Sequence, residues 1–241
     1  MGTSADRSAG SGGAWTPLKH ATNSYVRGIG RSDSTTRAER VLARHVPLLG
    51  GPAGAASSAR AGSAGIRQLG ALLSGIAANG VAGTLTTLGL SHLIGADRFV
   101  VLDELITFIT GDGDDLDAQA ARDAACDILD EVFGDADTAE DLAAVTVDET
   151  ELATILERFL ALYVYNRIPV VAERLSRLAD PTTMRKADQQ MRQIISDLVA
   201  ISLPDDLSSI DWQGSGGKAL ADNAIRSVYD TLAALDDQEH S

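Results

Sequence analysis

The sequence has little of what β-sheets and disulfides need. Phe, Trp and Tyr together make up 4% of its 241 residues, and there is a single cysteine, Cys126. Scarce aromatics, with Ala, Leu, Asp and Arg dominating, favour helices over strands. One cysteine excludes an intramolecular disulfide and is typical of a reducing compartment. Its small and apolar neighbours at helical spacing predict a buried, structural thiol.

Residue patterns for metal binding and catalysis are also missing. None of the four histidines has a cysteine or carboxylate three or four residues further on, as a helical metal site would. The chain contains no Gly-x-Ser-x-Gly nucleophile elbow. We therefore predict a protein that is not an enzyme, with no catalytic residue, metal ligand or cofactor. A hydrolase whose triad is assembled by folding stays open, with His45 or His92 beside a serine and a carboxylate.

Two motifs resemble ligand sites but fail in detail. Gly214–Lys218 is similar to part of a phosphate loop, yet Ala219 stands where such a loop has its magnesium-holding hydroxyl, and no predicted strand precedes it. The acidic turn Asp112–Asp117 lacks the glycine that a calcium loop needs at its sixth position. We expect a loop before the last helix at the first motif, and a helix N-cap, Asp115 or Asp117, at the second.

Charge is distributed unevenly along the chain. The net charge is −14, but residues 1–67 carry +6 and the remainder carries −20. An acidic body argues against a protein that coats nucleic acid, because phosphate repulsion would have to be overcome by the basic end alone. Direct nucleic-acid binding through that end stays open.

Residues 1–33 are rich in Gly, Ser, Thr and Ala, and we predict a disordered leader there, since this composition buries too little apolar surface to offset the entropy of ordering. Trp15, Pro17 and Leu18 form its apolar cluster, which could dock on a partner or on the body. No apolar signal-peptide core follows Met1, so we expect a cytoplasmic protein.

From Ser34 onward, apolar residues recur at helical spacing, and we predict one helical domain over residues 34–241 with a possible sub-boundary near 112–117. Pro169 should divide the longest helix, and Asp180-Pro181 should begin the next one. The fold class is therefore all-α, a multi-helix, bundle-like body behind a disordered leader. The expected helices cover residues 34–46, 69–94, 99–110, 116–133, 148–178, 180–203 and 218–235.

The segment Leu69–Ile94 contains no Asp, Glu, Lys or Arg, and two interpretations compete. Its glycines and polar residues favour two shorter helices, broken near Asn79-Gly80, in the core of a soluble protein. The alternative is a membrane-acting effector that inserts residues 66–95 as a hairpin. We favour the core over the membrane.

The amino terminus carries the one group with evident chemical use. Glycine in second place should let methionine aminopeptidase remove Met1, which leaves an unhindered α-amine on Gly2 with a pKa near 8. Asp6 stands where the myristoylation pattern has Ser or Thr, which weakens the possibility of a lipid anchor.

At these residues the chain resembles the QatB subunit of the four-gene Qat anti-phage systems. Members open with Met-Gly-Thr-Ser, as here, and continue through a Gly- and Ser-rich leader to a segment like Thr16-Pro17-Leu18. A Gly- and Ala-rich segment like Gly65–Gly95 follows, and then an acidic turn and helix like Asp112–Phe133. The leader departs from the family pattern because Ala14-Trp15 precedes Thr16 and the expected Gly-Pro is missing.

The resemblance implies a role beside an ATPase subunit, a QueC-like enzyme of 7-deazaguanine chemistry and a TatD-like nuclease. It implies that the QueC-like partner joins a 7-deazaguanine-type group to the Gly2 amine, so that this chain is the acceptor and a non-catalytic scaffold. A disordered leader is compatible with this role, because a chain terminus must extend away from the folded domain to enter another enzyme's active site. The expected recognition residues around Gly2 are Thr3, Ser4, Trp15, Pro17 and Leu18.

Overall fold

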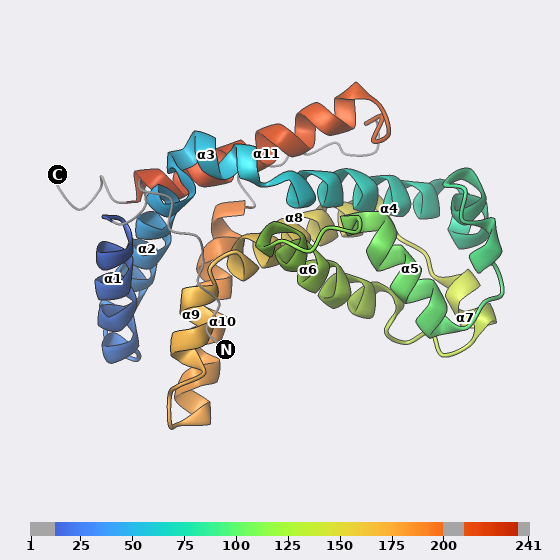
Figure 1. Cartoon of the computed structure of the whole chain (residues 1–241). Helices are drawn as coiled ribbons and strands as arrows, with labels where there is room; N and C mark the ends of the chain where they lie inside the picture. The colour runs from blue at the N-terminus through green and yellow to red at the C-terminus, as the bar shows by residue number, and fades with distance from the viewer. Residues whose placement is uncertain (1–12, 200–209, 236–241) are drawn as a thin grey trace. The chain divides into compact units, whose positions relative to one another are not determined.

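The computed structural model describes residues 13–199 and 210–235, and within these ranges it contains helices and no strand. The predicted all-α fold is confirmed (Figure 1). The first helices are α1 (Trp15–Gly28), α2 (Ser34–His45), the 3₁₀ helix η1 (Val46–Leu49), α3 (Gly51–Ser58), α4 (Arg60–Thr87) and the 3₁₀ helix η2 (Ser91–Leu93). They are followed by α5 (Arg98–Thr110), α6 (Leu116–Phe133), α7 (Ala139–Ala144), α8 (Glu149–Asn166), α9 (Pro169–Leu175), α10 (Pro181–Val199) and α11 (Ser215–Ala234).

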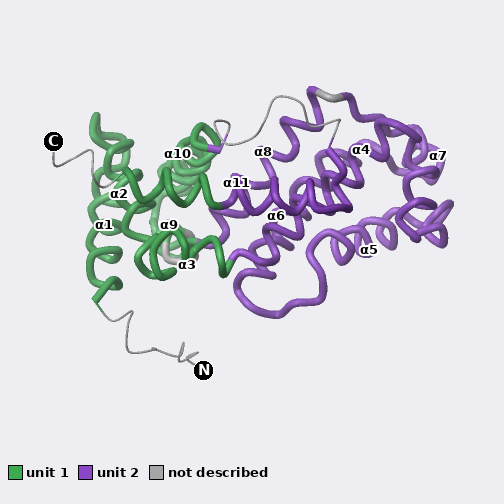
Figure 2. The backbone as a smooth tube through the Cα atoms, turned by 90° about the horizontal axis from the view of Figure 1, so that it is seen from above, with its two compact units in different colours: residues 1–58, 168–198, 226–241 green, residues 59–167, 199–225 purple. Residues whose placement is uncertain are grey.

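The helices form two compact units (Figure 2). Unit 1 comprises residues 1–58, 168–198 and 226–241, and unit 2 comprises residues 59–167 and 199–225. The suggested sub-boundary at 112–117 lies inside unit 2. The chain passes between the units more than once, so no single shift in composition marks the division.

The predicted leader is wrong for residues 15–28, because they form the helix α1. Leu18, Ala21, Thr22 and Tyr25 are buried, and they recur at the i, i+3, i+4, i+7 spacing of one helix face. The prediction rested on the average composition of residues 1–33, which does not reveal a short apolar stripe. Residues 1–12 lie outside the described residues.

Unit 1 is held together around the buried side chain of Tyr25. Its hydroxyl donates a 2.7 Å hydrogen bond to the Ala187 carbonyl oxygen in α10. Gln190, one turn further along α10, donates to the hydroxyls of Ser34 at 2.9 Å and Thr35 at 3.1 Å. Burial raises the pKa of Tyr25, and the nearby Asp188 raises it further. These contacts tie α10 to both α1 and α2.

Unit 2 is built on close packing against the glycines of α4. A Cβ atom placed on Gly62 would overlap the Tyr163 ring, and one on Gly65 would overlap the Phe159 ring. Phe159 and Tyr163 are fully buried on α8, and their rings are nearly parallel with centroids 6.4 Å apart. The absence of a side chain at Gly62 and Gly65 therefore leaves the space that the two aromatic rings of α8 fill.

A buried carboxylate joins three helices of unit 2. Asp117, in the first turn of α6, accepts a 2.7 Å hydrogen bond from the Ala61 amide at the start of α4 and another from the Tyr163 hydroxyl of α8. The Arg167 Nε atom, just after α8, lies 3.4 Å from the same carboxylate. Asp115 is the N-cap of α6 and accepts from the Ala118 amide. Of the two aspartates proposed as the cap, Asp115 has this role and Asp117 fastens α6 to its neighbours.

The predicted break near Asn79-Gly80 is confirmed, since Gly80 has φ 67° and ψ 174° and kinks α4 there. Within the described residues, α4 is the one helix whose length and composition would allow it to cross a membrane. Its most apolar window has a mean hydropathy of 1.3 and is half buried inside the protein. A buried core helix has the same character, so this feature is weak support for membrane insertion.

Other predicted helix boundaries also hold. The chain breaks between α8 and α9, which begins at Pro169. Asp180 precedes α10 and accepts hydrogen bonds from the Thr183 hydroxyl and from the Thr182 and Thr183 amides of its first turn. The bond from the Thr183 hydroxyl lowers the pKa of the Asp180 carboxyl group most, and the two amide bonds lower it further. Cys126 is exposed rather than buried, because its position on α6 faces away from the packed stripe of alanines.

Replacing Tyr25 with Phe should lower the free energy of unfolding by about 1 kcal/mol, because the Ala187 carbonyl loses its buried donor while the ring packing stays. Urea denaturation followed by circular dichroism measures this. Thr16→Val, which removes an exposed hydroxyl from the same helix, is the control and should change stability by less than about 0.5 kcal/mol. Equal effects of the two variants would contradict the role of Tyr25.

Replacing Gly65 with Ala should destabilise the protein by about 1–2 kcal/mol, although alanine is the better helix former. The added methyl group would overlap the Phe159 ring, and overpacking costs more than the helix propensity gains. Gly216→Ala on α11 is the matched control, since its Cβ would meet only the Asp211 carbonyl oxygen at 3.7 Å. That variant should be neutral or stabilising in the same denaturation experiment.

Candidate functional site

The predicted modification site lies at the end of the chain that leads into α1. Gly2, Thr3 and Ser4 fall outside the described residues. The first described helix after the amino terminus is α1, which begins at Trp15. The first helical backbone bond runs from the Leu18 amide to the Ala14 carbonyl oxygen at 3.4 Å.

The three predicted recognition residues of this first turn have different surroundings. Leu18 is fully buried and belongs to the core of unit 1. Pro17 is exposed. Proline is tolerated in the first turn of a helix because the amides of that turn have no acceptor within the helix. Trp15 is half-buried, with the Lys19 Nζ atom 5.9 Å from its ring centroid. Pro17 and part of Trp15 are thus accessible on the first turn of α1, whereas Leu18 anchors that helix in unit 1.

The accessible side of α1 carries basic residues. Lys19, His20 and Arg27 are exposed on it, while Leu18 and Tyr25 face the core. Arg27 also lies in the last turn of the helix, where a cation is favoured by the helix dipole. The helix α1 is therefore attached to the core through apolar contacts and carries basic residues on its exposed side.

No metal centre emerges from the rest of the described residues, which contain no group of three or more His, Cys, Asp or Glu side chains able to hold an ion. His92, one candidate base of a hidden triad, forms a surface pair with Glu104, with 2.8 Å between Nε2 and Oε2. His45, the other candidate, is buried in unit 1. Neither histidine lines the two hollows described below.

The phosphate-loop-like segment has a local role at the start of α11. The Asp211 carboxylate accepts a 3.1 Å hydrogen bond from the Gly214 amide, and the Asp211 carbonyl oxygen accepts a 2.9 Å bond from the Gly217 amide. A carboxylate already occupies the position where a phosphate loop would present amides to an anion. Lys218 pairs with Asp222 at 2.8 Å, one turn along the helix. This geometry agrees with a loop before the last helix.

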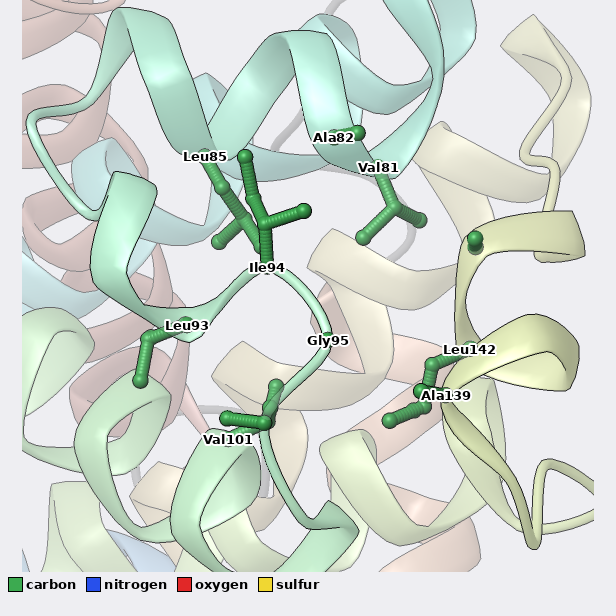
Figure 3. Close-up of a pocket in the computed structure, with 11 residues that line it drawn as sticks. Val81, Ala82, Leu85, Leu93, Ile94, Gly95, Val101, Ala139 and Leu142 are labelled. Atoms are coloured by element: carbon green, nitrogen blue, oxygen red, sulfur yellow. The ribbon is translucent and has the colours of Figure 1, made fainter.

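Two hollows open on unit 2. The first is apolar and holds about 30 Å³ between the second half of α4, the η2–α5 connection and α7 (Figure 3). The second holds about 190 Å³ beside Trp212, whose Nε1 atom is buried without a hydrogen-bond partner, as is the Ser74 Oγ atom on the same wall. Sequence reasoning missed both hollows, since their walls come from segments far apart in the chain.

Cys126 has no sign of an activated thiol. Partial desolvation of this exposed thiol by the atoms around it raises its pKa, and the neighbouring Asp123 and Asp127 raise it further. A reactive cysteine needs the opposite shift, because the thiolate is the nucleophile. Its exposure therefore does not by itself create a catalytic site.

Comparison with known proteins places the chain in a family. No curated protein and no solved structure matches it. The family model described as Qat anti-phage system associated protein QatB matches residues 50–232. This region includes the segments Gly65–Gly95 and Asp112–Phe133 and excludes α1, α2 and the amino terminus. Because the match covers about three quarters of the sequence, the chain belongs to the QatB family and has a role in a Qat anti-phage system.

Proposed function

We propose that this chain is the amine acceptor and a non-catalytic scaffold of a cytoplasmic Qat complex. In this proposal a QueC-like partner joins a 7-deazaguanine-type group to Gly2, and an ATPase subunit and a TatD-like nuclease bind the helical body. The supporting observation is that the chain that follows the amino terminus begins with α1, a helix fixed in unit 1 by the buried Leu18 and Tyr25.

The α-amine is the best nucleophile that the chain offers at cellular pH. An α-amino group has a pKa of about 8, so roughly a quarter of it is neutral at about pH 7.5, whereas a lysine with a pKa of about 10.4 is roughly 0.1% neutral. The sequence has three lysines, Lys19, Lys186 and Lys218. Lys218 already pairs with Asp222 at 2.8 Å. Competition from side-chain amines is therefore small.

The proposed reaction is amide formation. ATP converts the carboxylate of the donor into an acyl adenylate with release of pyrophosphate, the neutral Gly2 amine attacks the acyl carbon, and AMP leaves as the amide forms and a proton is lost. The partner supplies the ATP site and the catalytic groups. This chain supplies the nucleophile and the means of presenting it.

The length of chain ahead of α1 suits that role. Thirteen residues, from Gly2 to Ala14, can span at most about 45 Å when extended. That reach lets the amine enter an enclosed active site while α1 stays packed in unit 1. The accessible Trp15 and Pro17 lie at the base of this segment, where a partner that takes in the terminus would meet them.

The acceptor proposal predicts an added mass on Gly2 that requires the QueC-like partner. The full chain would be expressed with and without that partner, and its intact mass and the peptides of its first twenty residues compared. Replacing all three lysines with arginine should leave the modification unchanged. An arginine at position 19 retains a cation over Trp15, and an arginine at position 218 can still pair with Asp222.

A non-removable amino-terminal extension, which converts Gly2 into an internal residue, should abolish the added mass. Loss of modification in the triple lysine variant, or a plain Met-less mass in the presence of an active partner, would refute the acceptor role.

The recognition residues can be separated from the structural one. Trp15→Ser combined with Pro17→Ser should slow modification by about tenfold, on the scale of one lost interface anchor, with little loss of stability. Leu18→Ala should instead cost about 2–5 kcal/mol of folding free energy, because it leaves a cavity in unit 1. Time courses by mass spectrometry and urea denaturation measure the two effects. An unchanged rate in the Trp15/Pro17 variant would exclude these residues from recognition.

A further inference from the structure

Three exposed apolar residues lie close together in the sequence of unit 2. In the described part of the chain, four large hydrophobic residues are exposed, namely Ile94, Phe99, Val100 and Leu116. The first three lie within seven consecutive residues, where η2 leads into α5. Phe99 is 76% exposed and the other two are each 48% exposed. A solitary exposed apolar residue such as Leu116 is ordinary, but a cluster is typical of an interaction site.

The cluster borders the apolar hollow of Figure 3. Ile94 forms part of the wall of that hollow, and Val101, next to Val100, forms another part. Leu85 of α4 and Leu142 of α7 complete an apolar lining. A volume of about 30 Å³ is roughly that of one water molecule. It is much too small for a cofactor or metabolite, and suits the tip of one apolar side chain presented by a larger partner.

Acidic residues surround the cluster. On α5, Asp103 lies one turn after Phe99, and Glu104, which pairs with His92, lies one turn after Val100, so these two exposed apolar residues each have a carboxylate as a neighbour on the same helix face. The segments that form this surface, residues 81–104 and 135–145, contain seven Asp or Glu, one Arg and no Lys. The single arginine, Arg98, is largely covered and pairs with Asp130 at 3.4 Å and Asp137 at 3.7 Å.

We propose that the surface of Ile94, Phe99 and Val100, with the adjoining hollow, binds a segment of another protein that carries one large apolar side chain flanked by lysines or arginines. Charge complementarity decides between the possible occupants. A second copy that docked through the same surface would bring the same acidic rim against itself, and an anionic membrane would be repelled. A basic protein segment satisfies both the apolar centre and the acidic rim.

This inference rests on the scaffold part of the proposed function, because it takes the partner to be one of the other subunits. The probes are the ATPase, QueC-like and TatD-like subunits, each co-expressed with the full chain and co-purified with it. Affinity for any subunit that is retained would be measured by biolayer interferometry at low and at physiological salt.

Phe99→Ser should weaken binding of that subunit by at least about tenfold, as removal of a central aromatic anchor does. Leu116→Ser is the matched control, since Leu116 is 77% exposed and lies outside the cluster, and it should change affinity by less than about twofold. Neutralising the rim with Asp103→Asn and Glu104→Gln should weaken binding and reduce its salt dependence. Neutralising Asp112 and Asp114 beside Leu116 should do neither. Thermal melts would verify that these surface variants remain folded.

Three results would overturn the proposal. The first is equal binding by the Phe99→Ser and Leu116→Ser variants, or retention of none of the three subunits. The second is Phe99-dependent sedimentation with phosphatidylglycerol or phosphatidylcholine vesicles, which would make the surface a membrane contact. The third is Phe99-dependent dimerisation in sedimentation velocity, which would make it a self-association site. Modification of Gly2 is read separately by mass, so failure of this surface and failure of the acceptor proposal are distinguishable.

Discussion

Unit 2 depends on the distance at which α4 can approach the aromatic side chains of α8. Gly62 and Gly65 leave no room for a Cβ atom beneath Tyr163 and Phe159, and Gly70 likewise leaves none beneath Trp212. The close approach also brings the start of α4 within reach of Asp117, whose carboxylate accepts hydrogen bonds from the Ala61 amide and the Tyr163 hydroxyl. One aspartate and a few glycines therefore set the spacing of α4, α6 and α8.

The same packing explains why the charge-free segment allows two interpretations from sequence. Glycine permits close helix contacts in membranes and in soluble cores alike, so composition cannot distinguish them. Within the charge-free segment, Gly70 lies against the Trp212 ring and Gly75 against Thr84, and Gly80 ends the first part of the helix with a kink. A membrane-inserted state of this segment would have to give up the contact with Trp212. The core interpretation accounts for both the glycines and the break.

The proposed acceptor terminus and the proposed docking surface belong to different units. Unit 1 fixes α1 through Leu18 and Tyr25 at the base of the amino-terminal segment. Unit 2 carries the proposed docking surface, on which Phe99 is the most exposed apolar residue. A body that binds one partner through a folded surface and offers a chain end to an enzyme needs no active site, and the two functions can be removed separately by substitution.

The sequence by itself determined the helical fold, the break at Gly80, the cap at Asp180, and the composition that sets an acidic body against a basic amino-terminal part. These features are local: they depend on spacing, caps and helix breakers within a few residues, which act before any long-range contact forms. The family resemblance, too, was carried by short segments.

The tertiary structure alone decided that residues 15–28 fold as α1, since Leu18 and Tyr25 gain stability only by burial against other helices. It also decided that Cys126 faces solvent, that the chain divides into two interleaved units, and that Ile94, Phe99 and Val100 stay exposed beside a hollow. Helical periodicity shows which residues share a face, but whether another helix covers that face depends on segments distant in the chain.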